Sequence, residues 1–142
     1  MNSGGGDAPS LDGSRSAGAA CVACDRQGEA LAARAQARLR AAGFEVLRVE
    51  RESYPVADPM VRFLHGLQSR AMPVVLVISA SPESVHWLMA EVGANPTHYP
   101  SIVLLVDAAV DAARVPAAAL SEADLDGARL PEALSAACRP AC

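Results

Sequence analysis

Continuous apolar runs alternate with helical patterns along most of this chain. The runs PVVLVIS at 73–79 and SIVLLV at 101–106 are rich in β-branched residues and too short to span a bilayer. Such runs are typical of strands that are buried on both faces of a sheet. Weaker patterns predict strands at 19–24 and 44–49, and a fifth strand near Ala123–Leu125 stays open.

Each of these strands precedes a segment with apolar residues at helical spacing. The predicted helices cover Gly28–Ala42, a segment from Asp58 to about Arg70, a segment from Pro82 to Val92, and Leu130–Cys138. Prolines follow the cap residues Asp58 and Ser81 directly, and Gly43 is placed to end the first helix. Strands that alternate with helices over such short connections predict right-handed crossovers and a parallel sheet.

The expected fold class is therefore α/β, with a central parallel sheet of four to five strands and helices on both faces. Of the 142 residues, 51% are hydrophobic but only 4% are aromatic, so the core must consist mainly of Ala, Val and Leu. Residues 1–17 are mostly Gly, Ser and Asp, which predicts a disordered tail or linker. We expect one domain over 18–138 and a short C-terminal tail over 139–142.

The charged residues exclude several classes of partner and reaction. The formal net charge is -4 and no basic stripe is present, which argues against nucleic-acid binding. All twelve basic residues are arginines, which excludes Schiff-base chemistry and a phosphate-loop lysine. No apolar run approaches the roughly 18 residues of a membrane span, and a signal-peptide pattern is missing. We therefore expect a cytoplasmic protein without nucleic-acid or membrane partners.

Four cysteines form a CxxC at Cys21 and Cys24 and a CxxxC at Cys138 and Cys142. Two such pairs have the ligands of a tetrahedral zinc site if the chain ends meet. A CxxC that precedes a helix also fits a thioredoxin-like redox site with a thiol of low pKa. Against both, Cys21 and Cys24 fall within the first predicted strand. We therefore expect buried, reduced thiols and no metal.

Trp87 and Glu91 are the candidates for binding chemistry. They are four residues apart on a predicted helix, so their side chains lie one above the other. We expect the pair near the carboxyl end of the preceding strand, where ligands bind in open α/β sheets. Trp offers a flat face to a base and Glu a carboxylate to a ribose, but the spacing also fits a packed Trp and a solvated Glu. His65, His86 and His98 are expected at the surface.

Over about residues 18–138, the order of elements resembles a Toll/interleukin-1 receptor (TIR) domain of the bacterial type. The similarity is greatest in VVLVISASPESVHWLMAEV at 74–92, which resembles the family's strand, Ser-rich turn and helix with the pattern S-x-x-W-x-x-x-E. The residues at those positions are Ser84, Trp87 and Glu91. A second stretch, RAAGFEVLRVERESYPVADPMVRFL, is similar to the family's second strand and BB loop. The resemblance implies a flavodoxin-like fold.

Many TIR domains with the helix glutamate cleave NAD, so the resemblance implies an NAD glycohydrolase in signalling or immune defence. NAD is then the substrate, and neither a cofactor nor a metal is required. Glu91 is implied as the catalytic carboxylate that stabilises an oxocarbenium-like transition state. The implied substrate-binding residues are Trp87, Ser84, Cys24, Asp25, Ser53 and Tyr54.

Other TIR domains are scaffolds that act only by self-association, and this remains the alternative function. In both cases the resemblance implies that the Arg51–Pro59 loop docks onto a second copy. The contact residues would be Tyr54, Asp58 and Pro59. The presence of both Trp87 and Glu91 favours the enzyme.

Overall fold

The computed structural model of the chain describes residues 18–52, 54–55, 58–69, 72–80, 82–95, 98–111, 115–116 and 119–138, without the side chains of 82–86 and 138. The strands are β1 (Gly18–Asp25), β2 (Phe44–Arg51), β3 (Val74–Ile78), β4 (Ile102–Val106) and β5 (Leu120–Ser121). The α-helices are α1 (Glu29–Ala41), α2 (Asp58–Gln68), α3 (Pro82–Ala94) and α4 (Arg129–Cys138). Two 3-10 helices, η3 (Arg26–Gly28) and η5 (Glu122–Asp126), precede α1 and α4.

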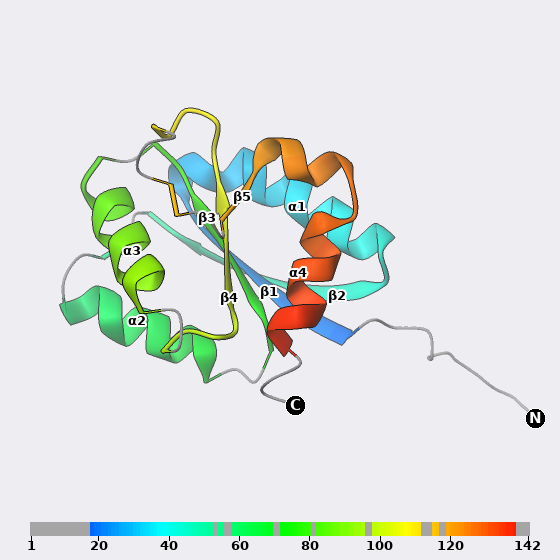
Figure 1. Cartoon of the computed structure of the whole chain (residues 1–142), viewed down its shortest axis with the longest axis horizontal. Coiled ribbons are helices and arrows are strands. Elements are labelled where there is room, and N and C mark those ends of the chain that lie inside the picture. The colour runs from blue at the N-terminus through cyan, green and yellow to red at the C-terminus, as the bar shows by residue number, and fades with distance from the viewer. Residues whose placement is uncertain are drawn as a thin grey trace, which may run out of the picture.

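The sheet has five parallel strands in the order β2-β1-β3-β4-β5. The chain first builds outward from β1 to β2 and then crosses back to add β3, β4 and β5 on the other side of β1 (Figure 1). The direction of winding therefore reverses between β1 and β3. In doubly wound sheets this reversal opens a crevice at the carboxyl ends of the two strands.

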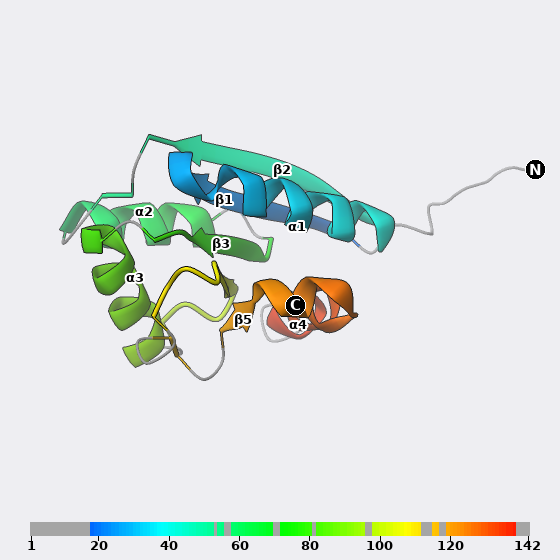
Figure 2. The ribbon, with the colours of Figure 1, turned by 90° about the horizontal axis from the view of Figure 1, so that it is seen from above.

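Helices cover both faces of the sheet and bury two separate apolar clusters (Figures 1 and 2). One face carries α2 and α3, which contribute Met60, Leu64 and Leu88 to the first cluster. The other face carries α1 and α4, which contribute Leu39 and Leu134 to the second. Full burial of such a side chain stabilises the fold by about 1.5–3 kcal/mol.

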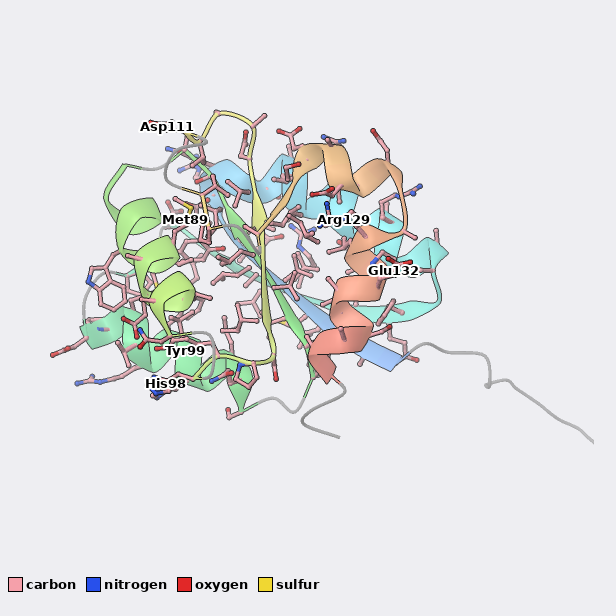
Figure 3. The ribbon with its side chains drawn as sticks, in the orientation of Figure 1. Met89, His98, Tyr99, Asp111, Arg129 and Glu132 are labelled. Carbon is pink, nitrogen blue, oxygen red and sulfur yellow. The ribbon has the colours of Figure 1, made fainter. Side chains whose placement is uncertain are left out.

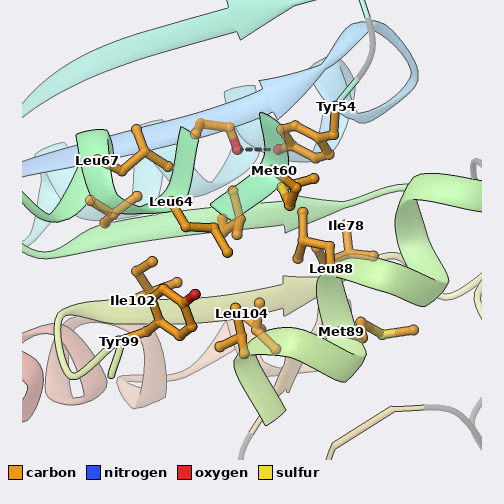
Figure 4. Packing of buried hydrophobic residues seen from close by; sticks show 14 of the residues in the cluster. Tyr54, Met60, Leu64, Leu67, Ile78, Leu88, Met89, Tyr99, Ile102 and Leu104 are labelled. Carbon is orange, nitrogen blue, oxygen red and sulfur yellow. Dashed lines mark hydrogen bonds between the residues drawn. The ribbon is translucent and has the colours of Figure 1, made fainter. Parts of the chain in front are cut away.

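Strands β3 and β4 are buried along their whole length because they have a helix layer on both sides. Val74, Leu76 and Ile78 belong to the cluster under α2 and α3, whereas Val75 and Val77 belong to the opposite cluster. Figure 4 shows the first of these clusters, with Leu64 and Leu88 between the helices and the sheet. This arrangement explains why the two runs are apolar throughout instead of alternating.

The predicted α/β fold class, with a parallel sheet and helices on both faces, is confirmed. The four principal strands begin and end within two residues of their predicted positions, and Gly43 has the left-handed φ of 99° expected after α1. A fifth strand exists, but its possible position near Ala123–Leu125 is wrong. Leu120–Ser121 form β5, and residues 122–126 form the 3-10 helix η5.

The predicted tails over 1–17 and 139–142 lie outside the described residues, and so does the cap residue Ser81. Within the described part of the chain, no helix is both long and apolar enough to cross a membrane.

Candidate functional site

The carboxyl ends of β1 and β2 border a cavity of about 490 Å³, which we call the crevice. Its lining residues come from the end of β1, the start of α1 and the end of β2: Cys24, Asp25, Arg26, Glu29, Glu50, Arg51 and Glu52. Carboxylates outnumber guanidinium groups in this lining. A crevice with that balance disfavours a ligand with phosphate groups.

Asp25 anchors the crevice from inside the fold, because its side chain is only 1% exposed. Its Oδ1 accepts a hydrogen bond from the backbone N–H of Gly28 over 2.9 Å, which caps η3. Its Oδ2 accepts a hydrogen bond from the hydroxyl of Ser79 over 2.9 Å. Since Ser79 directly follows β3, this contact joins the carboxyl ends of β1 and β3.

Tyr54 is buried near the carboxyl ends of β1 and β3 and does not lie on the surface. The pairing of β1 with β3 reaches only to Ala23 and Leu76. Just beyond that point, the Tyr54 hydroxyl is 2.9 Å from the carbonyl oxygen of Ala23 and 2.8 Å from that of Val77. Figure 4 draws one of these contacts as a dashed line. Tyr54 therefore supplies the donor that the separating strands no longer provide to each other.

The predicted contact of Tyr54 with a second copy is wrong, because its side chain is 4% exposed and the centroid of its ring lies 5.7 Å from that of Phe63. Burial, with a smaller contribution from the charge of Asp25, raises the pKa of Tyr54 well above its ordinary value. A contact with a second copy needs an exposed side chain, which Asp58 and Pro59 have. Self-association through the Arg51–Pro59 loop stays a prediction, with Tyr54 removed from its contact residues.

The two described cysteines are structural side chains of β1 and are free of disulfides. Cys21 belongs to the cluster under α2 and α3, and Cys24 belongs to the opposite cluster. In a strand, residues three apart are separated by about 10 Å, whereas a disulfide requires Cα atoms within about 7 Å. The thioredoxin-like alternative is therefore wrong for Cys21 and Cys24, which match the expected buried thiols of a strand.

The thiol of Cys24 also lacks the electronic character of a redox nucleophile. Burial raises its pKa, although the nearby guanidinium of Arg48 lowers it in part, with Nη2 3.8 Å from Sγ. No three His, Cys, Asp or Glu side chains in the described ranges gather as a possible metal site. Cys138 and Cys142 have no described side chains, so the zinc alternative is not tested at those positions.

Glu91 lies near the amino ends of the strands, whereas the crevice lies at their carboxyl ends. Its Oε2 accepts a hydrogen bond from the hydroxyl of Tyr99 over 2.7 Å, and Tyr99 precedes the amino end of β4. Figure 3 shows Tyr99 and His98 at one edge of the molecule, while Asp111, which follows β4, lies at the other. The predicted position of Glu91 near the carboxyl end of β3 is therefore wrong.

The length of α3 explains the misplacement. The helix starts after the carboxyl end of β3, and its thirteen residues rise about 20 Å. The five residues of β3 span only about 16 Å, so α3 runs back along the whole strand. Glu91 falls in the last turn and hence at the amino edge. Trp87, one turn earlier, is half-buried against the cluster under α2 and α3.

A second cavity, of about 580 Å³, lies beside Tyr99 between α3, α4 and the amino half of β4, and we call it the groove. Its lining is mainly apolar and comprises Val92, Gly93, Tyr99, Pro100, Ile102, Val103, Leu104, Pro116, Ala119, Ala133, Ala136 and Ala137. The groove exists because β5 pairs only with Leu105 and Val106, which leaves the amino half of β4 without a strand on that side.

The predicted substrate-binding residues do not form one pocket. Cys24 and Asp25 line the crevice, and Trp87 lies on α3. Ser53 and the side chain of Ser84 lie outside the described residues. Two polar residues that the sequence analysis did not single out, Ser79 and Tyr99, hold Asp25 and Glu91 instead. The available signals were a serine directly after a buried strand and a tyrosine three residues before the start of one.

The fold and these two cavities define a flavodoxin-like α/β domain with a polar crevice at one edge and an apolar groove near the other. Comparison with models of known protein families gave no match, and neither curated proteins nor solved structures matched the chain. The resemblance to TIR domains therefore rests on the motif residues alone.

Proposed function

We propose that this protein is an NAD glycohydrolase in which Glu91 stabilises the positive charge that develops on the ribose as nicotinamide leaves. The observation that carries the proposal is the bond between Glu91 and Tyr99 at the wall of the groove. An oxocarbenium-like transition state is positively charged, so a fixed carboxylate stabilises it more than it stabilises the substrate.

Tyr99 supports this role by holding one oxygen of the carboxylate. Burial raises the pKa of Tyr99 to about 12, and the hydrogen bond to Glu91 adds to the effect. The hydroxyl therefore keeps its proton at neutral pH and remains a donor. The other oxygen, Oε1, has no hydrogen-bond partner among the described residues, which leaves it for a substrate.

The groove supports an aromatic ligand better than the crevice does. Its volume of about 580 Å³ lies within the usual range of small-molecule sites, and its alanine and proline walls suit a base or a nicotinamide ring. Glu91 is not among its lining residues, but it accepts a hydrogen bond from Tyr99, which is one of them. The carboxylate-rich crevice would repel the pyrophosphate of NAD.

A cytoplasmic location is part of the proposal. Cys21 and Cys24 are buried and form no disulfide, which is compatible with the reducing environment of the cytosol.

Binding of NAD beside α3 should quench the fluorescence of Trp87, which is the one tryptophan of the chain. We expect saturable quenching on titration with NAD, together with free nicotinamide measured by chromatography. The variant Glu132→Gln, at an exposed position on α4, should behave as the wild type. Quenching without nicotinamide would refute the glycohydrolase and favour a domain that only binds, and the absence of both would refute the site.

A further inference from the structure

The outer edge of β2 is a long strand edge without a strand beside it in the described part of the chain. All eight residues of β2 pair with β1 on the inner side, and β2 ends the strand order of the sheet. Figure 2 shows β2 along one border of the molecule, with no other labelled element beyond it. An open edge presents backbone N–H and C=O groups that are ready to pair with another strand.

The side chains of β2 alternate between the two faces of the sheet. Phe44 and Val46 pack in the cluster under α1 and α4, and Arg48 bonds to Gln36 of α1. The odd-numbered residues lie on the opposite face, where Val49 packs against the cluster under α2 and α3. Leu47 lies on that same face. Among the described residues it is the large hydrophobic residue that is exposed, at 44%.

Strand edges that must stay single usually carry a proline, a bulge or charged side chains. Strand β2 does carry four charges, but they are two of each sign, so a second copy can supply opposite charges to them. The segment FEVLRVER has no proline or glycine, and its pairing with β1 continues without a bulge. Its exposed leucine also stands on the face that carries Glu45 and Arg51. Both features suit a strand that pairs with a partner.

We propose that β2 pairs in antiparallel fashion with β2 of a second copy of this chain, across a two-fold axis at Arg48. This contact continues the parallel sheet of one copy into that of the other. It is independent of NAD cleavage, and it shares only Arg51 with the predicted loop contact.

The register follows from the rules of antiparallel pairing. Residues directly opposite each other must both direct their backbone groups toward the partner strand or both away from it, so the axis passes through a residue. With the axis at Arg48, Glu45 faces Arg51 of the second copy and Leu47 faces Val49 of the second copy. Symmetry repeats both pairs, so two opposite-charge pairs flank two apolar pairs on one face.

The neighbouring registers pair the residues of the Glu45–Arg51 face less well, because they place charged residues opposite apolar ones. An axis at Leu47 places Glu45 opposite Val49 of the second copy and so leaves the charge unpaired. An axis at Val49 places Leu47 opposite Arg51 of the second copy and leaves residues 44–46 without partners. The axis at Arg48 is the one that matches charge with charge and apolar with apolar on the face that carries Glu45, Leu47, Val49 and Arg51. On the other face it places Val46 opposite Glu50 of the second copy.

On the other face, this register brings the two Arg48 side chains opposite each other. Their repulsion is reduced because each guanidinium is already bonded within its own chain. The Nη2 atom lies 2.6 Å from Oε2 of Glu50, and Nη1 donates to Oε1 of Gln36 over 2.8 Å. Each arginine therefore meets its counterpart as part of a compensated group.

A charge exchange between Glu45 and Arg51 tests both the contact and its register. Light scattering over a wide concentration range should show wild-type protein passing from the mass of one chain to twice that mass. Glu45→Arg places like charges opposite each other in both symmetry-related pairs. Its dimer dissociation constant should rise about tenfold or more. The double variant Glu45→Arg with Arg51→Glu restores the opposite charges and should dimerise again.

Glu45→Arg is the cleaner single change, because Arg51 also lies over the ring of Phe63 at 5.1 Å. Glu132→Arg on α4 is the matched control and should dimerise as the wild type. Thermal unfolding of each variant establishes that it is folded. Wild-type protein that stays monomeric at every concentration would overturn the proposal, as would a dimer that Glu45→Arg leaves intact or that the double variant does not restore.

Discussion

Replacing Glu91 with glutamine should lower the kcat for nicotinamide release about 100-fold or more, the size of effect seen when one charge-stabilising group is removed from an active site. The amide has almost the same shape and still accepts a hydrogen bond from Tyr99, so the fold and NAD binding should persist. Only the negative charge is lost, and that charge acts mainly in the transition state. The KM should therefore change much less than kcat.

Steady-state kinetics on Glu91→Gln, Glu132→Gln and the wild type measure this effect. Glu132→Gln removes an exposed carboxylate from another helix and should leave kcat unchanged. Tyr99→Phe should cause a smaller loss than Glu91→Gln, because it releases the carboxylate without removing the charge. Equal kcat values for Glu91→Gln and the wild type would assign the chemistry to another residue.

Replacing Tyr54 with phenylalanine should lower the free energy of unfolding by about 1–3 kcal/mol, the cost of leaving buried polar groups without a partner. The ring remains, so no cavity forms. The carbonyl oxygens of Ala23 and Val77 lose the donor that lies 2.9 Å and 2.8 Å from them. Both carbonyls belong to buried strand residues, so water does not replace the lost hydroxyl readily.

Urea unfolding of Tyr54→Phe measures this cost, with Tyr99→Phe as the matched control. Both side chains are buried tyrosines, at 4% and 3% exposure. The partner of Tyr99 is the half-exposed carboxylate of Glu91, which water can reach after the substitution. A loss for Tyr54→Phe no larger than that for Tyr99→Phe would show that the hydroxyl does not hold the strands.

The burial of Tyr54 could not be predicted from the sequence. The stretch RESYPVADP has two prolines and several polar residues, which correctly predicts an interruption between β2 and α2. Whether its tyrosine faces solvent or the core depends on the separation of β1 from β3. Those strands are distant in sequence, so no local pattern around Tyr54 indicates where they separate.

The fold was predictable because β3 and β4 lie at the middle of the sheet. Burial on both faces selects apolar residues at every position, and this leaves a strong local signal. Strand β5 has two residues at the edge, inside an alanine-rich stretch, and such a short segment has no periodicity to detect. Its position was therefore set by pairing with Leu105 and Val106 rather than by its own sequence.

The candidate site was predictable in part. Helical spacing placed Glu91 one turn after Trp87, and that relation depends only on the helix. Which edge of the sheet the pair occupies depends on where α3 begins and how far it runs, and the thirteen residues of α3 carry Glu91 to the amino edge. The partner Tyr99 comes from the next connection, which the helix pattern does not describe.

Proton NMR of NAD incubated with concentrated wild-type protein tests the central claim most directly. The account predicts resonances of free nicotinamide that grow in proportion to protein concentration and stay absent with Glu91→Gln. NAD that remains intact beside folded wild-type protein would contradict it.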